Sequence, residues 1–116
     1  MASLRTNIEE RGEVLVLKLS GDLTSHCAPS FGILWRKQVA TGHHKVAIDF
    51  TEVGLLSSAG IGEIVSLTRE VQSKDGGLAL CNLNETCTDA LELTGLLPIL
   101  NVFSNLDAGI IGLINA

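Results

Sequence analysis

The sequence predicts an α/β fold, in which crossover helices connect the strands of a mixed, mostly parallel β-sheet. From residue 14 onward, short apolar runs typical of strands alternate with longer segments that have helical periodicity. Aromatic residues make up only 3% of the 116-residue chain, so the core must be built from aliphatic side chains. This length suits one domain, which we expect to span residues 1–116. The pattern leaves open whether the helices cover one face of the sheet or both.

The chain is expected to begin with two strands. Residues 3–10 predict a partly exposed strand, and Arg11-Gly12 is a turn signal. Val14–Ser20 is the clearer strand, because it is an apolar run in which three leucines point one way and Lys18 falls on the opposite face. The apolar residues expected on one face are Leu15, Leu17 and Leu19.

A first helix is expected over residues 26–40. The preceding loop, residues 22–25, supplies candidate N-cap side chains. Pro29 falls in the first turn, where its missing N–H has no helical partner to lose. Trp35 lies on the apolar side and is expected to pack on the sheet, and Gly42 ends the helix.

The central stretch runs from a buried strand into a second helix. A β-branched apolar run begins at Val46 and is bounded by Asp49, which indicates a buried strand. After turn residues, Ser57-Ser58 opens an apolar run with helical spacing, in which one face comprises Ile61, Ile64, Val65 and Thr68. A serine hydroxyl is therefore expected at a helix N-terminus beyond the end of a strand. In open α/β sheets, function tends to lie there.

The last third of the chain predicts two short strands and two helices. Gly95 followed by Pro98 is the usual order at a helix end, and Pro98 would suit an edge strand. Gly109 and Gly112 weaken the final helix. The expected segments are a loop at 73–77, a strand at 78–82, a helix capped by Asn84 or Thr86 and running to Leu93, a strand at 99–103, and a helix capped by Ser104 or Asn105.

Charge, apolar runs and cysteine content argue against a nucleic-acid-binding, secreted or membrane-spanning protein. The net charge of −5 argues against nucleic-acid binding, which requires clustered Lys or Arg. No signal peptide is visible, and no apolar run is long enough to span a bilayer. The three cysteines, an odd number without metal-type spacing, are interpreted as reduced, buried or half-buried thiols. We therefore expect a cytoplasmic protein without direct membrane insertion.

Patterns for the common enzyme classes do not fit. A nucleophile elbow needs a glycine two residues on either side of the serine, but Ser58 has Leu56 and Gly60 there, and Ser57 has Leu55 and Ala59. The only candidate bases are His26, His43 and His44. Gly60-Ile-Gly62 lacks the third glycine of a dinucleotide fingerprint, and no Walker motif exists. We expect no enzyme activity, no metal and no cofactor.

Two interpretations of Ser57-Ser58 remain open from the residues alone. A serine at this place can cap the helix by accepting a hydrogen bond from a first-turn N–H, which is worth ~1 kcal/mol. It can also be a phosphorylation switch, because a phosphate at a helix N-terminus meets free N–H groups and the positive end of the helix dipole. The two roles do not exclude one another.

Three segments of the sequence, at residues 49–62, 20–23 and 93–96, together resemble motifs of the STAS domain family, the fold of bacterial anti-sigma-factor antagonists. Asp49-Phe-Thr-Glu-Val-Gly-Leu-Leu-Ser-Ser-Ala-Gly-Ile-Gly62 is similar to the signature Asp-Leu-Ser-x-Val-x-x-Ile-Asp-Ser-Ser-Gly-Leu-Gly. Ser20-Gly-Asp-Leu23 resembles the family's Gly-Glu-Leu after its second strand. Leu93-Thr-Gly-Leu96 resembles the Ser/Thr-Gly-Leu that ends its third helix. Order and spacing agree over nearly the whole chain.

The resemblance implies a regulator that binds an anti-sigma factor while unphosphorylated and so releases the sigma factor. The anti-sigma factor is usually also a serine kinase, and a metal-dependent, PP2C-type phosphatase reverses the modification. Ser58 occupies the position of the acceptor, Ser57 is the alternative acceptor, and Ala59 replaces a second, non-acceptor serine. The residues that the resemblance places at the partner-binding surface are Asp22, Thr24, Ser25, Ser57, Ser58, Ala59, Gly60 and Gly62.

Two departures from the family pattern affect this interpretation. Ser57 and Thr24 stand where the family has aspartates, so the surroundings of the acceptor are less negative and docking of the kinase can differ. One alternative is a STAS scaffold or complex subunit, stressosome-like or transport-associated, whose serine only caps the helix. Another is a module that binds nucleotides or anions.

Overall fold

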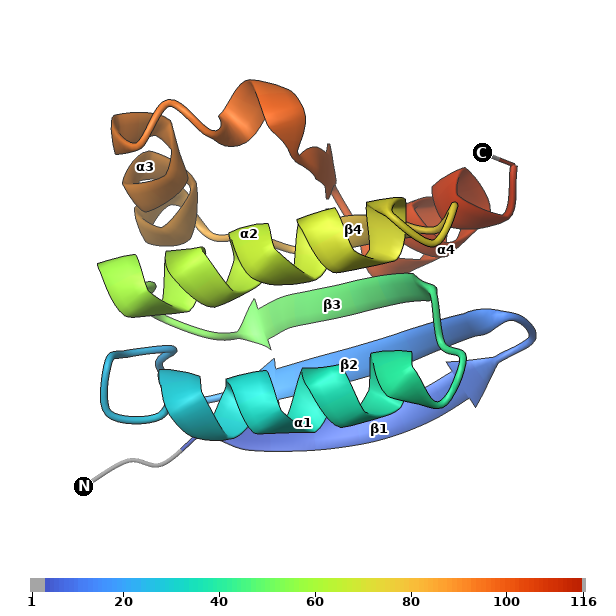
Figure 1. Cartoon of the computed structure of the whole chain (residues 1–116). Coiled ribbons are helices and arrows are strands. Elements are labelled where there is room, and N and C mark those ends of the chain that lie inside the picture. Colours follow the sequence, from blue (N-terminus) through green and yellow to red (C-terminus); the bar gives the residue numbers. More distant parts are fainter. Residues whose placement is uncertain (1–3, 116) are drawn as a thin grey trace.

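The computed structural model describes residues 4–115 and contains one five-stranded sheet with the strand order β1-β2-β3-β4-β5 (Figure 1). β1 pairs antiparallel with β2, and all other neighbours are parallel. The strands are β1 (Arg5–Arg11), β2 (Val14–Ser20), β3 (Lys45–Glu52), β4 (Gly77–Cys81) and β5 (Asn101–Phe103). The predicted α/β class with a mixed, mostly parallel sheet is confirmed.

Helices cover both faces of the sheet, which the sequence pattern had left open. β2 shows the two sides most clearly, because its residues alternate between two core clusters. As predicted, Leu15, Leu17 and Leu19 share one face and pack in the larger cluster with residues of α1, α2 and α3. Val14 and Val16 belong to the smaller cluster with α4. The helical segments are α1 (Ala28–Ala40), α2 (Ser58–Gln72), α3 (Glu85–Leu93), the 3₁₀ turn η1 (Leu97–Ile99) and α4 (Leu106–Ile114).

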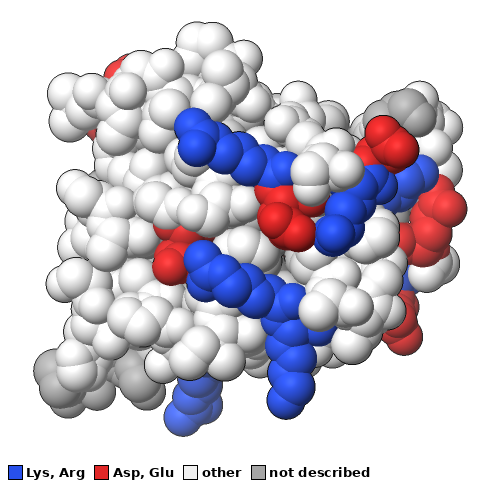
Figure 2. Space-filling model, viewed as in Figure 1, with Lys and Arg blue, Asp and Glu red and all other residues white. Residues whose placement is uncertain are grey.

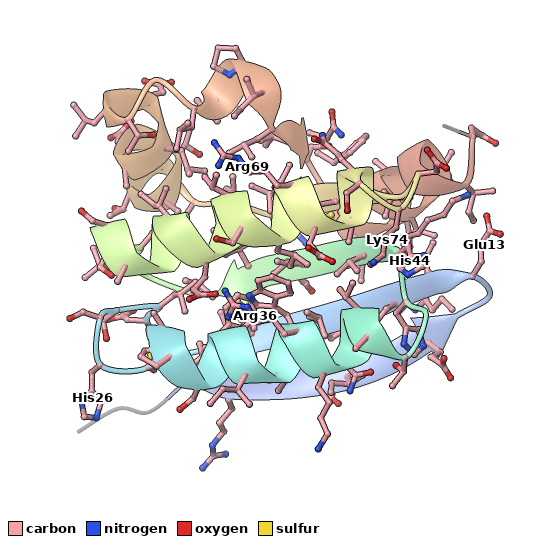
Figure 3. All side chains as sticks on the ribbon, in the orientation of Figure 1. Glu13, His26, Arg36, His44, Arg69 and Lys74 are labelled. Carbon is pink, nitrogen blue, oxygen red and sulfur yellow. The ribbon has the colours of Figure 1, made fainter. Side chains whose placement is uncertain are left out.

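Trp35 joins α1 to α2 as well as to the core. It is only 3% exposed, so the prediction that it packs inside is confirmed. Its indole N–H donates to Glu63 Oε1 of α2 at 2.9 Å. Arg36 points from α1 toward α2 (Figure 3), where its guanidinium stacks on Trp35 and lies 3.3 Å from the same Glu63 oxygen. The two helices that precede and follow β3 are thus held side by side.

Several predicted boundaries were wrong. α1 begins at Ala28, and its N-cap residue is Cys27, without a capping side chain from residues 22–25. Arg11, predicted in a turn, ends β1, while residue 3 lies outside the described residues. Gly77, predicted in a loop, begins β4, whereas Asn82, predicted in that strand, follows its end.

The region around Pro98 also differs from the prediction. Residues 97–99 form η1, and β5 contains only residues 101–103 of the strand predicted over 99–103. Proline fixes φ near −65° and has no N–H to donate to a neighbouring strand, so the extended segment starts only after it.

Helix ends follow the predicted chemistry. Asn84 and Asn105, not Thr86 or Ser104, are the N-caps of α3 and α4, and their side chains accept hydrogen bonds from the N–H groups of Cys87 and Ala108. Gly95 directly follows the C-cap of α3 with φ 73°, a left-handed conformation that glycine adopts without strain.

Candidate functional site

The loops that follow β2 and β3 are joined by backbone hydrogen bonds at the carboxyl edge of the sheet. Leu23 N–H donates to the Leu55 carbonyl at 3.0 Å, and Ser57 N–H donates to the Leu23 carbonyl at 2.9 Å. Leu23 and Leu56 form a parallel bridge beyond the ends of the strands. The start of α2 is therefore fixed against the β2–α1 loop.

Ser57 and Ser58 have different roles in the local structure. Ser57 is the N-cap of α2, and its hydroxyl accepts a hydrogen bond from Gly60 N–H at 3.3 Å. Ser58 is the first helical residue, is exposed, and its hydroxyl makes no hydrogen bond to any of residues 4–115. Capping therefore occupies one serine and leaves the other hydroxyl accessible.

The two glycines of α2 differ in what surrounds them. Gly60 is buried, and a Cβ built on it would lie 2.7 Å from both the carbonyl oxygen and Cγ of Leu23. Gly62 is exposed and has nothing within 4 Å of such a Cβ. Only Gly60 is therefore required for the close approach of α2 to the β2–α1 loop.

The fold brings the residues predicted at the partner surface to one edge of the molecule. Asp22 and Ser25 are exposed and Thr24 is half-buried, all within the β2–α1 loop. The Asp22 carboxylate lies beside the backbone of Gly54, 3.1 Å from an ideal Cβ there. On α2, Ala59 is exposed next to Ser58. These residues are adjacent, while their contact with a partner remains a prediction.

The histidines are not gathered around the serines. Figure 3 shows His44 at the end of the molecule opposite to the start of α2, and His26 pointing away from α2. His43 Nε2 lies 2.6 Å from Glu10 Oε1, at the His44 end. Residues 4–115 also contain no cluster of three or more His, Cys, Asp or Glu side chains that could hold a metal ion.

Sequence reasoning missed the role of Cys27 in shaping the β2–α1 loop. Its buried thiol donates to the Asp22 carbonyl at 3.1 Å and accepts from Thr24 N–H at 3.4 Å. The thiol thus binds the loop that carries three predicted surface residues, Asp22, Thr24 and Ser25. The sequence offers no signal for this role, because a lone buried cysteine is most often a small packing residue.

Asn84 is a second residue whose importance was underestimated. Its Oδ1 accepts from Cys87 N–H at 2.7 Å, the predicted capping bond. Its Nδ2 donates to the carbonyls of Val53 and Gly54 at 3.1 and 3.4 Å. One amide therefore caps α3 and also holds the β3–α2 loop.

Asp49 lies within β3, where hydrogen bonds from neighbouring side chains and backbone hold its carboxylate. Its Oδ1 accepts from Thr51 N–H and Oγ1 at 3.0 and 2.6 Å, and from Asn82 Nδ2 at 3.0 Å. Partial burial, the largest single influence, acts to raise the pKa of Asp49. The hydrogen bonds from Thr51 and Asn82 and the charge of Lys18 outweigh burial, and together they lower the pKa below its ordinary value of 3.8.

The Asp49→Asn variant is expected to show a weaker dependence of its free energy of unfolding on pH in the acid range than the wild type. A carboxyl whose pKa is lowered by folding stabilises the fold above its unfolded pKa, and loses that contribution as the pH falls through the folded value. The wild-type protein should therefore lose stability below about pH 3.8 more steeply than the variant. Urea unfolding between pH 2.5 and 6 measures the two slopes, and equal slopes would contradict the assignment.

The match to a known family covers almost all of the described chain. The family model of the STAS domain matches residues 5–109. The chain belongs to the STAS domain family. An anti-sigma F factor antagonist of Paenibacillus polymyxa is 22% identical to this STAS chain over 104 residues, which cover 89% of each protein.

Solved structures agree with the STAS fold. An anti-sigma factor antagonist from Mycobacterium paratuberculosis superposes with a TM-score of 0.88 at 22% identity, covering 96% of this chain and 94% of that one. The phosphorylated form of the Bacillus cell fate determinant SpoIIAA gives a TM-score of 0.70 at 21% identity, covering 90% and 96%. In this STAS chain, no helix within residues 4–115 is long and apolar enough to cross a membrane.

Proposed function

We propose that this chain, one STAS domain over residues 1–116, is an anti-sigma-factor antagonist, and that Ser58 is its phosphorylation switch. The proposal is supported mainly by the different environments of the two serines. Ser57 caps α2, while the Ser58 hydroxyl is exposed and makes no hydrogen bond within residues 4–115. In the proposed role the protein is not an enzyme, needs no cofactor, binds no nucleic acid and acts in the cytoplasm.

A phosphate on Ser58 suits its place at the first position of α2. It adds a charge of about −1.5 to −2, which the positive end of the helix dipole and the first-turn N–H groups accept. Because Ser57 supplies the cap, modifying Ser58 leaves the hydrogen bond to Gly60 N–H intact. The fold therefore tolerates the added charge, and the change falls on the surface.

In this proposal, the unphosphorylated edge binds a serine-kinase anti-sigma factor. The exposed or half-buried residues of the contact surface are Asp22, Thr24, Ser25, Ser57, Ser58, Ala59 and Gly62, and the buried Gly60 supports the backbone beneath them. Leu55, 44% exposed in the adjoining loop, adds apolar area. A phosphate on Ser58, within this contact surface, would have to be desolvated when the partner binds. We expect this cost to weaken the complex by ~2 kcal/mol, roughly 30-fold. A PP2C-type phosphatase would restore the binding form.

The switch is tested by incubating the protein with the kinase-type anti-sigma factor encoded nearest to it and ATP, followed by mass spectrometry of the peptides. We expect phosphate on Ser58 in the wild type and in Ser57→Ala, and none in Ser58→Ala. Ser58→Glu should bind the anti-sigma factor at least about tenfold more weakly than Ser58→Ala. Phosphate only on Ser57 would show that Ser57, not Ser58, is the acceptor. Phosphate on neither serine would reject the phosphorylation switch.

A second candidate function is a STAS scaffold without a switch. It is supported by two strongly exposed apolar side chains on helices, Ile33 and Leu93, which the switch does not use.

A further inference from the structure

Leu93 and Ile33 are the two most exposed large apolar side chains among the described residues. Leu93, at the end of α3, is 90% exposed, and Ile33, in the middle of α1, is 71% exposed. Isolated exposed apolar residues are common on protein surfaces. These two are unusual because the charged residues near them on their helices have opposite signs, acidic near Leu93 and basic near Ile33.

Leu93 lies in an entirely acidic part of the chain. α3 contains Glu85, Asp89 and Glu92, all exposed, and no Lys or Arg. Residues 75–116 contain no Lys or Arg at all, and they hold five of the thirteen acidic residues. Asp89 precedes Leu93 by one helical turn, so the two share a side of the helix. We name Asp89, Glu92 and Leu93 the α3 face.

Ile33 lies among basic residues. α1 contains Arg36 and Lys37 and no acidic residue, and both follow Ile33 by about one turn. Glu63 partly neutralises Arg36 at 3.3 Å, whereas Lys37 is exposed and has no ion pair within residues 4–115. We name Ile33, Arg36 and Lys37 the α1 face. Figure 2 shows blue side chains along α1, whereas the visible surface of α3 is mostly white with some red at its margin, and the blue side chain beside it is Arg69 of α2, labelled in Figure 3.

We propose that the α1 face of one copy docks on the α3 face of a second copy. Each face has an apolar residue at its centre and charges beside it, and the charges are of opposite sign. Contact would bury Ile33 and Leu93 together and bring Lys37 close to Asp89 and Glu92, which removes apolar surface from water and pairs the charges. The occupant is a second copy because this chain itself carries both complementary faces.

The two faces lie apart on one molecule, with α2 between α1 and α3 (Figure 1). In the proposed contact the copies meet head to tail, so it is heterologous: one copy of the pair keeps a free α3 face and the other keeps a free α1 face. Further copies can add at both ends, so the assembly grows with concentration. Neither face contains Ser58, and the proposal does not depend on the switch.

Sedimentation velocity of the purified chain tests the proposal. The monomer has a mass of 12.3 kDa. We expect the weight-average mass of the wild type to rise with concentration, and to fall again when salt is raised from 0.05 to 0.5 M, because salt screens the paired charges. Ile33→Glu and Leu93→Lys should each weaken self-association at least about tenfold, since each puts a like charge at the centre of the contact.

Mixing the two variants is the decisive step. Ile33→Glu retains an intact α3 face and Leu93→Lys an intact α1 face, so an equimolar mixture should form a dimer of about twice 12.3 kDa that does not grow further. Ile111→Glu on α4, where the isoleucine is 58% exposed, is the matched control and should associate like the wild type. Far-UV circular dichroism confirms that each variant is folded.

Three results would overturn the proposal. A wild type that stays monomeric at millimolar concentration removes the contact altogether. Single variants that associate like the wild type place the contact elsewhere. A mixture that remains monomeric, at concentrations where the wild type associates, shows that these two faces do not bind each other.

Discussion

Gly60→Ala is expected to lower the free energy of unfolding by ~2–3 kcal/mol. The new Cβ would lie 2.7 Å from the carbonyl oxygen and Cγ of the buried Leu23. The side chain can rotate, but the carbonyl cannot move freely because it accepts the hydrogen bond from Ser57 N–H. α2 must then shift from the β2–α1 loop, an overpacking cost of this size. Urea unfolding followed by circular dichroism measures it.

Gly62→Ala is the matched control on the same helix. Apart from its chain neighbours and the backbone of its own helix, nothing lies within 4 Å of the added Cβ, and the residue is exposed. Alanine favours the helix over glycine by up to ~1 kcal/mol, so this variant should be more stable than the wild type. If both substitutions shift stability in the same direction, close approach at Gly60 does not explain the difference.

Leu23→Ala is expected to cost ~3 kcal/mol of unfolding free energy. The side chain is fully buried at 0% exposure, in the core cluster formed with α1, α2 and α3. Its removal loses apolar transfer energy and leaves a cavity that the paired loops cannot fill completely. The backbone hydrogen bonds of Leu23 to Leu55 and Ser57 remain possible in the variant. The measured loss of stability therefore reports on the Leu23 side chain alone. Thermal and urea unfolding measure the loss.

Leu55→Ala provides the comparison within the paired loop. Leu55 is 44% exposed and contributes its carbonyl, not its side chain, to the bond with Leu23. We expect a loss below ~1 kcal/mol, because the half-exposed side chain gives up less apolar area on truncation. A loss equal to that of Leu23→Ala would show that the loop depends on Leu55 for packing.

The elements near the site could be predicted because local sequence determines them. The apolar run of residues 14–20 predicted β2 with the bounds that the structure has, and Ser57-Ser58 before a helical apolar face predicted the start of α2. The resemblance to the STAS signature assigned Ser58 to the acceptor position, and this role stays a prediction. Periodicity and capping chemistry are properties of neighbouring residues, so one sequence suffices to recognise them.

The bonds that hold the site together could not be predicted in this way. Cys27 binds the backbone of its own loop, and Asn84 joins loops about thirty residues apart. Nothing in the sequence distinguishes an asparagine that only caps a helix from one that also donates to a distant carbonyl. The assignment of capping to Ser57 and exposure to Ser58 likewise depends on the angle at which the chain enters α2.

The three buried cysteines make this protein suited to single-site fluorescent labelling. All are free thiols, and burial raises the pKa of Cys81 to about 12 and also raises that of Cys87. Little thiolate forms at neutral pH, so maleimide reagents should react slowly with both. A cysteine introduced at exposed Gly62 should therefore take up a dye selectively without removal of the native thiols, and would report on anything that approaches the start of α2.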